Sequence, residues 1–421
     1  MLNAKPCGRV SPLATTWTLS ALPSLSRSGR ATTSPFDWHA TNSTPSGLTA
    51  INRPLVTFEA KTETVNPAGT VSSAGPAGQR ERLEATLETM PSTFFDAVRV
   101  HPEPFEYLNE RAVHETLVAS PHTYLDYLDR SLADIAAGDI VVEQPSKLVF
   151  TDPGSAGDFR VMPCIVRRGS NVRKIVKIVG TNVVQKAVRD QITVGKAFCL
   201  DTAENFVTHI IEACLLSSAR TGGCAAIALK QLARRRRRIT VIGAGRVGCY
   251  AALYATALGG VEEVSFVDLL PERAEAAARL AADAFKSGTV FQAREHGSRI
   301  DADAVILATT AHRAVLRPVD TSAPLVISAG ADTAHQHELG PEWATVADVY
   351  VDTTDGFRVG DLRAWVQDGL IRTDGAIDLV SLYREGPRPG TARRLFISTG
   401  SALFDNLTIS YILDGSAPEP N

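Results

Sequence analysis

Apolar positions follow a helical period first and a strand-like pattern afterwards in the part of the chain beyond residue 94, where we expect order to begin. Across residues 104–137 they recur at helical spacing, with charged residues between them. Short apolar runs at residues 147–150, 160–166 and 174–179 then predict strands separated by glycine-containing turns. We expect these runs to form a mixed sheet.

Residues 238–268 follow the order strand, turn, helix, strand. An apolar run ends at Gly243, Gly245 and Gly248, and an alanine-rich helical pattern leads to a second run that ends at Asp268. Gly243 permits a tight turn, Gly245 lets the backbone approach a pyrophosphate, and Gly248 lets the helix pack on its strand. The alternative is a parallel-sheet turn without a ligand, but the flanking strands and the spaced acid favour dinucleotide binding.

Asp268 indicates which dinucleotide is bound. A carboxylate at this place accepts hydrogen bonds from both hydroxyls of an adenosine ribose and repels a 2′-phosphate, so NAD is favoured over NADP. The free N–H groups at the start of the helix would bind the pyrophosphate. The predicted cofactor-binding residues are Thr221, Gly243, Gly245, Arg246, Val247, Gly248, Asp268 and Thr309.

The segments around this unit complete a predicted α/β fold. Residues 204–233 read as helical and lead into the first nucleotide-binding strand. A helix at residues 271–285 and strands at 304–308, 325–328 and 349–352 form a second half of a Rossmann-type, doubly wound parallel sheet. The closing segment, residues 395–413, contains a strand and then a helical pattern, and it could return to complete the first domain.

Four basic residues upstream of the glycine loop are candidates for substrate binding: Lys147, Arg160, Lys177 and Arg220. Lys177 interrupts an apolar run, where a lysine needs either a wet face or a partner. A substrate carboxylate would be such a partner, and the exposed face of a half-buried strand is the alternative. Arg220 can hold a carboxylate at two points, or it forms a surface salt bridge.

Asp332 is the candidate catalytic residue. It follows a strand that should end at the carboxyl edge of the sheet, where ligands bind in doubly wound folds. An acid there can orient an amine or transfer a proton, or it caps a helix that starts near His335. The neighbouring His335, His337 and Glu338 lack further ligands at suitable spacing, so we expect no metal site.

Charge and composition exclude some classes of function. The net charge of −3 gives no general attraction to nucleic acid. The run of five arginines at residues 234–238 could bind polyanions, but a solvated helix end and linker is favoured because cations suit a helix C-terminus. The six cysteines show no CxxC pair and predict a reducing compartment, and no apolar run has the length that a bilayer requires. We expect a soluble, cytoplasmic protein without a membrane partner.

The first 90 residues are rich in Ser, Thr, Pro, Ala and Gly, which predicts a largely disordered extension. Residues 1–36 contain basic residues and many hydroxyls but no acid. This composition is compatible with an organelle transit peptide and equally with an extension that has no role.

Several motifs together resemble the ornithine cyclodeaminase and mu-crystallin family. In chain order they are PSKLVF, FRVMP, VKIVGTN, SARTGGCAA, VIGAGRVG, SAGADTAHQHEL and STGSALFDN, and they cover roughly residues 140–410. The resemblance implies a homodimer. It also implies a mixed α/β domain for substrate binding and dimerisation, made of residues 91–219 together with 353–421, and an NAD-binding Rossmann domain at residues 220–352.

The resemblance also implies a reaction at the Cα–N bond of an L-amino acid. Lys147, Lys177 and Arg220 would bind the substrate carboxylate, and Asp332 would handle the amine. In ornithine cyclodeaminase, hydride passes from L-ornithine to NAD and returns to a cyclic imine, which gives L-proline and ammonia. We take this reaction as the first expectation.

Arg160 departs from the ornithine cyclodeaminase pattern, which has an acid at this position. An arginine changes the local charge by two units and favours a substrate with a second anionic group, such as an N-carboxyalkyl amino acid. The alternatives are therefore a dehydrogenase of such a compound, an imine reductase, or a mu-crystallin-like binding protein that lacks catalysis.

Overall fold

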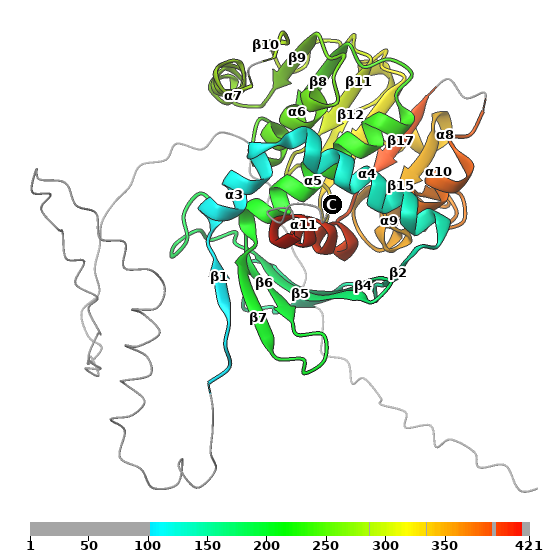
Figure 1. The fold of residues 1–421 in the computed structure, drawn as a ribbon. Helices are drawn as coiled ribbons and strands as arrows, with labels where there is room; N and C mark the ends of the chain where they lie inside the picture. The colour runs from blue at the N-terminus through cyan, green and yellow to red at the C-terminus, as the bar shows by residue number, and fades with distance from the viewer. Residues whose placement is uncertain (1–101, 286, 334, 390–392, 415–421) are drawn as a thin grey trace, which may run out of the picture. The chain divides into compact units, whose positions relative to one another are not determined.

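The computed structural model describes residues 102–285, 287–333, 335–389 and 393–414. Three predictions fall on residues outside the described ranges. They are a disordered extension over residues 1–90, order from Phe94, and targeting by residues 1–36. Everything that follows concerns the described part of the chain, which contains two large sheets, one two-stranded sheet and the helices packed on them (Figure 1).

The first sheet has seven strands and confirms the three strands expected before the glycine loop. Its strands are, in spatial order, β1 (Glu106–Leu108), β7 (Val207–Glu212), β6 (Thr193–Leu200), β5 (Asn171–Thr181), β4 (Asp158–Arg168) and β2 (Ile140–Glu143), with β3 (Leu148–Thr151) also paired to β4. All neighbours are antiparallel except β1 and β7. The sheet is therefore mixed, as expected.

The helical expectation for residues 104–137 is wrong for β1 and is confirmed by two helices after it. After β1, α3 (Glu110–Ala119) ends at Ser120 and α4 (Pro121–Ala137) begins with a proline. Proline lacks the N–H that a helix interior needs but is accepted in the first turn, so it separates the two helices. Asn109 caps α3 by accepting from the N–H of Ala112.

The second sheet has eight parallel strands and is the doubly wound sheet that the sequence predicts. Its strands are, in spatial order, β10 (Val290–Ala293), β9 (Glu263–Val267), β8 (Arg238–Ile242), β11 (Ala304–Leu307), β13 (Leu325–Ser328), β17 (Arg394–Ile397), β15 (Asp348–Val351) and β16 (Ile377–Asp378). The central strands are fully buried because apolar side chains cover both faces.

The helices packed on the second sheet are α6 (Arg246–Ala257), α7 (Pro271–Ala284), α8 (Trp343–Val346), α9 (Gly360–Gln367) and α10 (Leu379–Glu385). A short pair of strands, β12 (His312–Leu316) and β14 (His337–Leu339), lies beside this sheet.

One helix contacts both sheets, and a second helix packs on it and on the first sheet. Helix α5 (Cys214–Leu232) contacts β6 of the first sheet and β13 of the second, and helix α11 (Ala402–Asp414) packs on β4, β5 and α5 (Figure 1). Only part of the closing segment therefore returns to the first sheet. The assignment of all of residues 353–421 to the first domain is wrong for β16 and β17, because β17 pairs with β13 and β15 in the second sheet.

The helical expectation for residues 204–233 is wrong over its first part. Residues Val207–Glu212 form β7, because this β-branched stretch pairs with β6 on one side and β1 on the other. Residues 234–237 of the arginine run lie between the end of α5 and the start of β8, as a linker would, and Arg238 is the first residue of β8. Arg237 pairs with Glu262, and Arg238 pairs with Asp301. Among the described helices, none combines the length and apolar composition that crossing a membrane requires.

Candidate active site

The glycine loop joins β8 to α6 and leaves the start of the helix open. Gly243 has a φ of +98°, which a residue with a side chain rarely adopts. A Cβ atom on Gly248 would lie 2.0 Å from the carbonyl oxygen of Gly243, so this glycine allows the helix to pack against the turn. A Cβ atom on Gly245 would meet no atom within 4 Å, and no side chain caps α6. Free N–H groups at a helix start with open space in front of them fit a pyrophosphate.

Asp268 lies at the end of β9, beside this loop. Its carboxylate accepts from the N–H of Ala244 at 2.8 Å and from the N–H of Leu270 at 3.0 Å. The two bonds hold the acid in place next to the glycine loop, which is where the ribose of a dinucleotide would need it. The geometry fits the NAD preference predicted from the sequence.

One cavity of about 570 Å³ joins the glycine loop to the basic residues. Its wall includes ten of the predicted site residues: Lys147, Arg160, Lys177, Arg220, Thr221, Gly245, Arg246, Val247, Thr309 and Asp332. Gly243, Gly248 and Asp268 are not on its wall; Gly243 and Gly248 shape the turn behind it. The side chain of Arg246 donates to the backbone oxygen of Asp190 on the loop between β5 and β6, which also borders the cavity. The volume is in the range of pockets that enclose small ligands.

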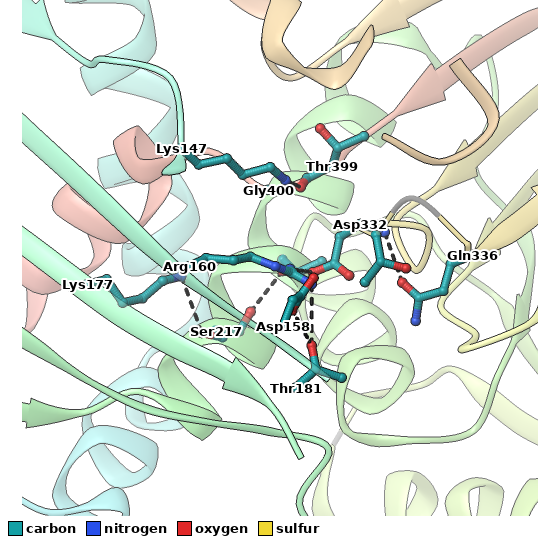
Figure 2. Close-up of polar contacts among 12 residues, drawn as sticks. Lys147, Asp158, Arg160, Lys177, Thr181, Ser217, Asp332, Gln336, Thr399 and Gly400 are labelled. Atoms are coloured by element: carbon teal, nitrogen blue, oxygen red, sulfur yellow. Dashed lines mark hydrogen bonds and ion pairs between the residues drawn. The ribbon is translucent and has the colours of Figure 1, made fainter. Parts of the chain in front are cut away.

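Arg160 and Asp332 form an ion pair at the cavity. A guanidinium nitrogen of Arg160 donates to a carboxylate oxygen of Asp332 at 2.6 Å, and the other nitrogen binds Asp158 at 3.1 Å (Figure 2). The Arg160 side chain is 8% exposed and that of Asp332 is 37% exposed. Arg160 is therefore held by two acids, and its side chain turns toward the site.

Asp332 belongs to the loop that follows β13 and caps no helix. Its backbone N–H donates to the side-chain oxygen of Gln336 at 3.2 Å, and β14 rather than a helix follows. Burial raises the pKa of this carboxyl, but the positive charges of Arg160 and Lys147 lower it more, so the net pKa lies below its usual range. Asp332 is thus ionised at neutral pH.

Lys177 and Arg220 share one buried carboxylate. Lys177 Nζ lies 2.6 Å from Asp405 Oδ1, and Arg220 Nε lies 3.1 Å from the same oxygen. The side chains of Lys177 and Arg220 are 1% and 8% exposed, which excludes the alternatives of an exposed strand face and a surface salt bridge. Burial lowers the pKa of Lys177 to about 8, because the loss of water outweighs the attraction of Asp405.

Lys147 approaches the cavity from just before β3. Its ammonium donates to the carbonyl oxygen of Thr399 at 2.8 Å (Figure 2). Burial lowers its pKa, and the attraction of Asp332 offsets this only in part. The segment that holds Thr399 is itself fixed by Asp352, whose carboxylate accepts from the N–H groups of Thr399 and Gly400. The four predicted basic residues therefore lie around one cavity.

Sequence reasoning missed the roles of three buried acids that organise the site: Asp352, Glu338 and Asp405. Glu338 accepts hydrogen bonds from the backbone and hydroxyl of Thr309, from the Ser328 hydroxyl and from the Gly330 N–H, so it joins the ends of β11 and β13. Burial raises the pKa of Asp352 and of Glu338. A signal was present for Asp405, an acid within an otherwise apolar helical pattern.

The histidines near Asp332 lie in different surroundings. His337 Nδ1 lies 3.1 Å from Asp361 Oδ1, and His335 is on the surface. Within the described ranges, no group of three or more His, Cys, Asp or Glu side chains is placed to hold a metal ion.

The order of the sequence motifs from PSKLVF to STGSALFDN, together with the two large sheets, points to one protein family. A family model described as the ornithine cyclodeaminase/mu-crystallin family matches residues 107–413. The protein belongs to this family. The resemblance drawn from the short motifs is thereby confirmed.

Proteins whose names give different reactions are similar to this chain. Delta(1)-pyrroline-2-carboxylate reductase 1 of Burkholderia multivorans is 26% identical over 239 residues, which span 56% of this chain and 74% of that protein. The Thermococcus litoralis Delta(1)-pyrroline-2-carboxylate reductase, in complex with NADH and L-proline, matches with a TM-score of 0.65 at 19% identity and covers 73% of this chain and 96% of that one. A lysine cyclodeaminase that recognises L-lysine, L-ornithine and L-2,4-diaminobutyric acid matches with a TM-score of 0.62 at 22% identity and covers 75% and 93%. The structural matches establish the fold.

Proposed function

We propose that the protein is an NAD-dependent oxidoreductase that reduces a 2-imino carboxylate to an L-amino acid, or runs this reaction in reverse. The observation that carries the proposal is the Arg160–Asp332 ion pair, which lies in the same cavity as Lys147, Lys177, Arg220 and the glycine loop. NADH would supply hydride to the α-carbon of the imine. Atoms balance as imine, NADH and a proton giving amine and NAD.

The basic residues would bind the substrate carboxylate. Arg220 offers a planar donor and Lys147 offers an ammonium, and both border the cavity. Holding the carboxylate at two points orients the α-carbon toward the glycine-loop side of the cavity, which raises the rate through proximity. The ionised Asp332 would accept a hydrogen bond from the imine nitrogen and stabilise its protonated form, the more reactive electrophile.

Cyclodeamination of a diamino acid is the second candidate, supported by family membership and by the similarity to lysine cyclodeaminase. Charge argues against it as the main activity. The described wall of the cavity carries six Lys or Arg side chains but only two acids, Asp190 and Asp332. A second substrate ammonium would have to compete with Arg160 for Asp332.

A substrate panel tests the proposal. Protein and NADH are incubated with Delta(1)-pyrroline-2-carboxylate or with pyruvate and ammonia, while NAD is supplied with L-ornithine, L-lysine, L-alanine or an N-carboxyalkyl glutamate. Products are identified by mass spectrometry. We expect turnover of a cyclic or linear 2-imino carboxylate, and a preference for NADH over NADPH because of Asp268. Turnover of L-ornithine alone would support cyclodeamination instead, and no turnover of any compound would refute both.

Assembly as a homodimer is part of the proposal. Exposed apolar side chains gather on the first sheet, at Leu148, Val149 and Phe150 of β3, Phe159 of β4 and Ile178 of β5. An apolar group of this kind fits a surface that a second copy covers. Light scattering should give twice the 45.0 kDa mass of the chain, and a monomer at micromolar concentration would contradict this expectation.

A further inference from the structure

Asp405 lies behind the substrate cavity in the first turn of α11, a helix that is apolar along most of its length. Its side chain has no exposed area, and it lies 228 residues from Lys177 in the sequence. Both cations that it contacts, Lys177 and Arg220, belong to the cavity wall, whereas Asp405 itself does not. The acid therefore reaches the cavity only through these two side chains.

Asp405, Lys177 and Arg220 together carry a net charge of +1. This charge matches a single substrate carboxylate, whereas two cations without Asp405 would be costly to bury. Guanidinium groups stay charged in proteins, but a lysine readily loses its proton when it is buried. Asp405 thus has a different effect on each cation. It orients Arg220, and it both orients Lys177 and keeps it protonated.

We propose that Asp405 is a positioning residue that holds Lys177 charged and fixes Lys177 and Arg220 in the geometry that binds the substrate carboxylate. This inference deepens the proposed function and rests on it. It requires no contact between Asp405 and the substrate.

Lys177 faces charged groups from three elements besides its own. They are Asp405 on α11, Arg220 on α5 and Arg160 on β4. The titratable Cys164 on β4 and Tyr124 on α4 interact with Asp405. Of these groups, Asp405 is the acid that stabilises the protonated lysine. Since the pKa of Lys177 is lowered to about 8, its charge is present below that pH and is lost as the pH rises through it. The wild-type kcat/KM for the imine should therefore fall above about pH 8.

The Asp405→Asn variant tests the proposal. We expect KM for Delta(1)-pyrroline-2-carboxylate to rise about tenfold or more, because one partner of a buried charge pair is removed, while the Kd of NADH stays within about twofold. The alkaline fall of kcat/KM should move to lower pH, since Lys177 then loses its proton more easily. If Asp405 had a purely structural role, the substitution would lower the melting temperature but would not shift the alkaline fall of kcat/KM.

Asn406→Ala is the matched control. Asn406 is the next residue of α11, has no exposed area and donates at 3.1 Å to the backbone oxygens of Cys164 and Arg173. Its loss should weaken the packing of α11. In the folded enzyme, KM and the pH at which kcat/KM falls should stay unchanged. If Asp405→Asn behaves like this control, the proposal is overturned.

The Lys177→Met and Lys177→Met/Asp405→Asn variants cover the case in which Asp405→Asn fails to fold. The double variant removes the positive charge of Lys177 and the negative charge of Asp405. The net charge of the buried group therefore stays the same as in the wild type. We expect the increases in KM from the two single changes to combine to less than their product, because Asp405 acts partly through Lys177. If Asp405→Asn fails to fold, the double variant should then raise KM by less than about threefold over Lys177→Met. A larger rise in KM would refute the proposal. Where both single variants fold, increases in KM that multiply independently would also refute it.

Binding of pyrrole-2-carboxylate, an unreactive planar carboxylate, separates failure of this inference from failure of the proposed function. Its Kd is measured by calorimetry with NADH present, in the wild type and in Asp405→Asn. Weaker binding in the variant supports the role of Asp405 even if no imine in the panel is reduced. Equal binding in both proteins overturns this role, whichever substrates the wild type turns over.

Discussion

Replacing Asp332 with Asn should lower kcat/KM for the imine by a factor of about 10² to 10⁴, the range that a positioned acid or base contributes. The amide keeps the size of the side chain but loses the negative charge that stabilises the protonated imine. Arg160 would also lose its ion-pair partner at 2.6 Å and keep only Asp158. Steady-state kinetics with a saturating concentration of NADH measures the effect.

The pH dependence of this variant adds a second observation. Because Arg160 and Lys147 keep the pKa of Asp332 below its usual range, the wild-type acid is ionised throughout neutral pH. The ratio of wild-type to variant activity should therefore be constant between about pH 6 and 8. Asp374→Asn, the same change at an exposed acid that pairs with Arg372, serves as the control. Activity of Asp332→Asn within threefold of the wild type would exclude a role for this carboxylate in the reaction.

Replacing Gly245 with Ala should weaken NADH binding by about tenfold to a hundredfold without unfolding the protein. A Cβ atom there meets no protein atom within 4 Å, and Gly245 does not have a positive φ, so the fold tolerates it. The methyl group would instead occupy the space in front of the α6 N-terminus, where the pyrophosphate binds in the proposed complex. Fluorescence titration with NADH gives the Kd, and circular dichroism follows the fold.

Two other glycines sharpen the interpretation. Gly288→Ala is the control, because a Cβ atom at this position also meets nothing within 4 Å but lies away from the cavity. Gly248→Ala should disturb the fold itself, since its Cβ atom would lie 2.0 Å from the oxygen of Gly243. If Gly245→Ala binds NADH as tightly as the Gly288→Ala control, the glycine loop does not bind the cofactor in the way proposed.

Local patterns in the sequence predicted most of the nucleotide-binding half. The run before Gly243, the glycine spacing and Asp268 all belong to one short segment, so chain connectivity already places them together. The same holds for the strands around residues 147–179, which pair with their neighbours in the chain. Errors arose where pairing depends on distant segments, as in β7, which pairs with the distant β1 as well as with its chain neighbour β6.

The predicted candidates for the site also came from the sequence, but their relations did not. Lys177 in an apolar run implied a partner, and Arg160 implied a change in substrate charge. Neither pattern could identify Asp405 or the Arg160–Asp332 pair, because the partners are separated by 228 and 172 residues. Only folding brings such groups within hydrogen-bond distance, and their energies depend on burial, which a linear pattern does not contain.

The sequence by itself thus determined the family, the doubly wound sheet and ten of the residues that border the cavity, since these follow from periodicity and short motifs. The tertiary structure decided how the charges are balanced. It placed a helix from the end of the chain behind the site, where Asp405 neutralises one of two cations, and it turned Arg160 toward Asp332. Electrostatic balance is a property of three-dimensional distance and of water exclusion, and so it appears only once the chain is folded.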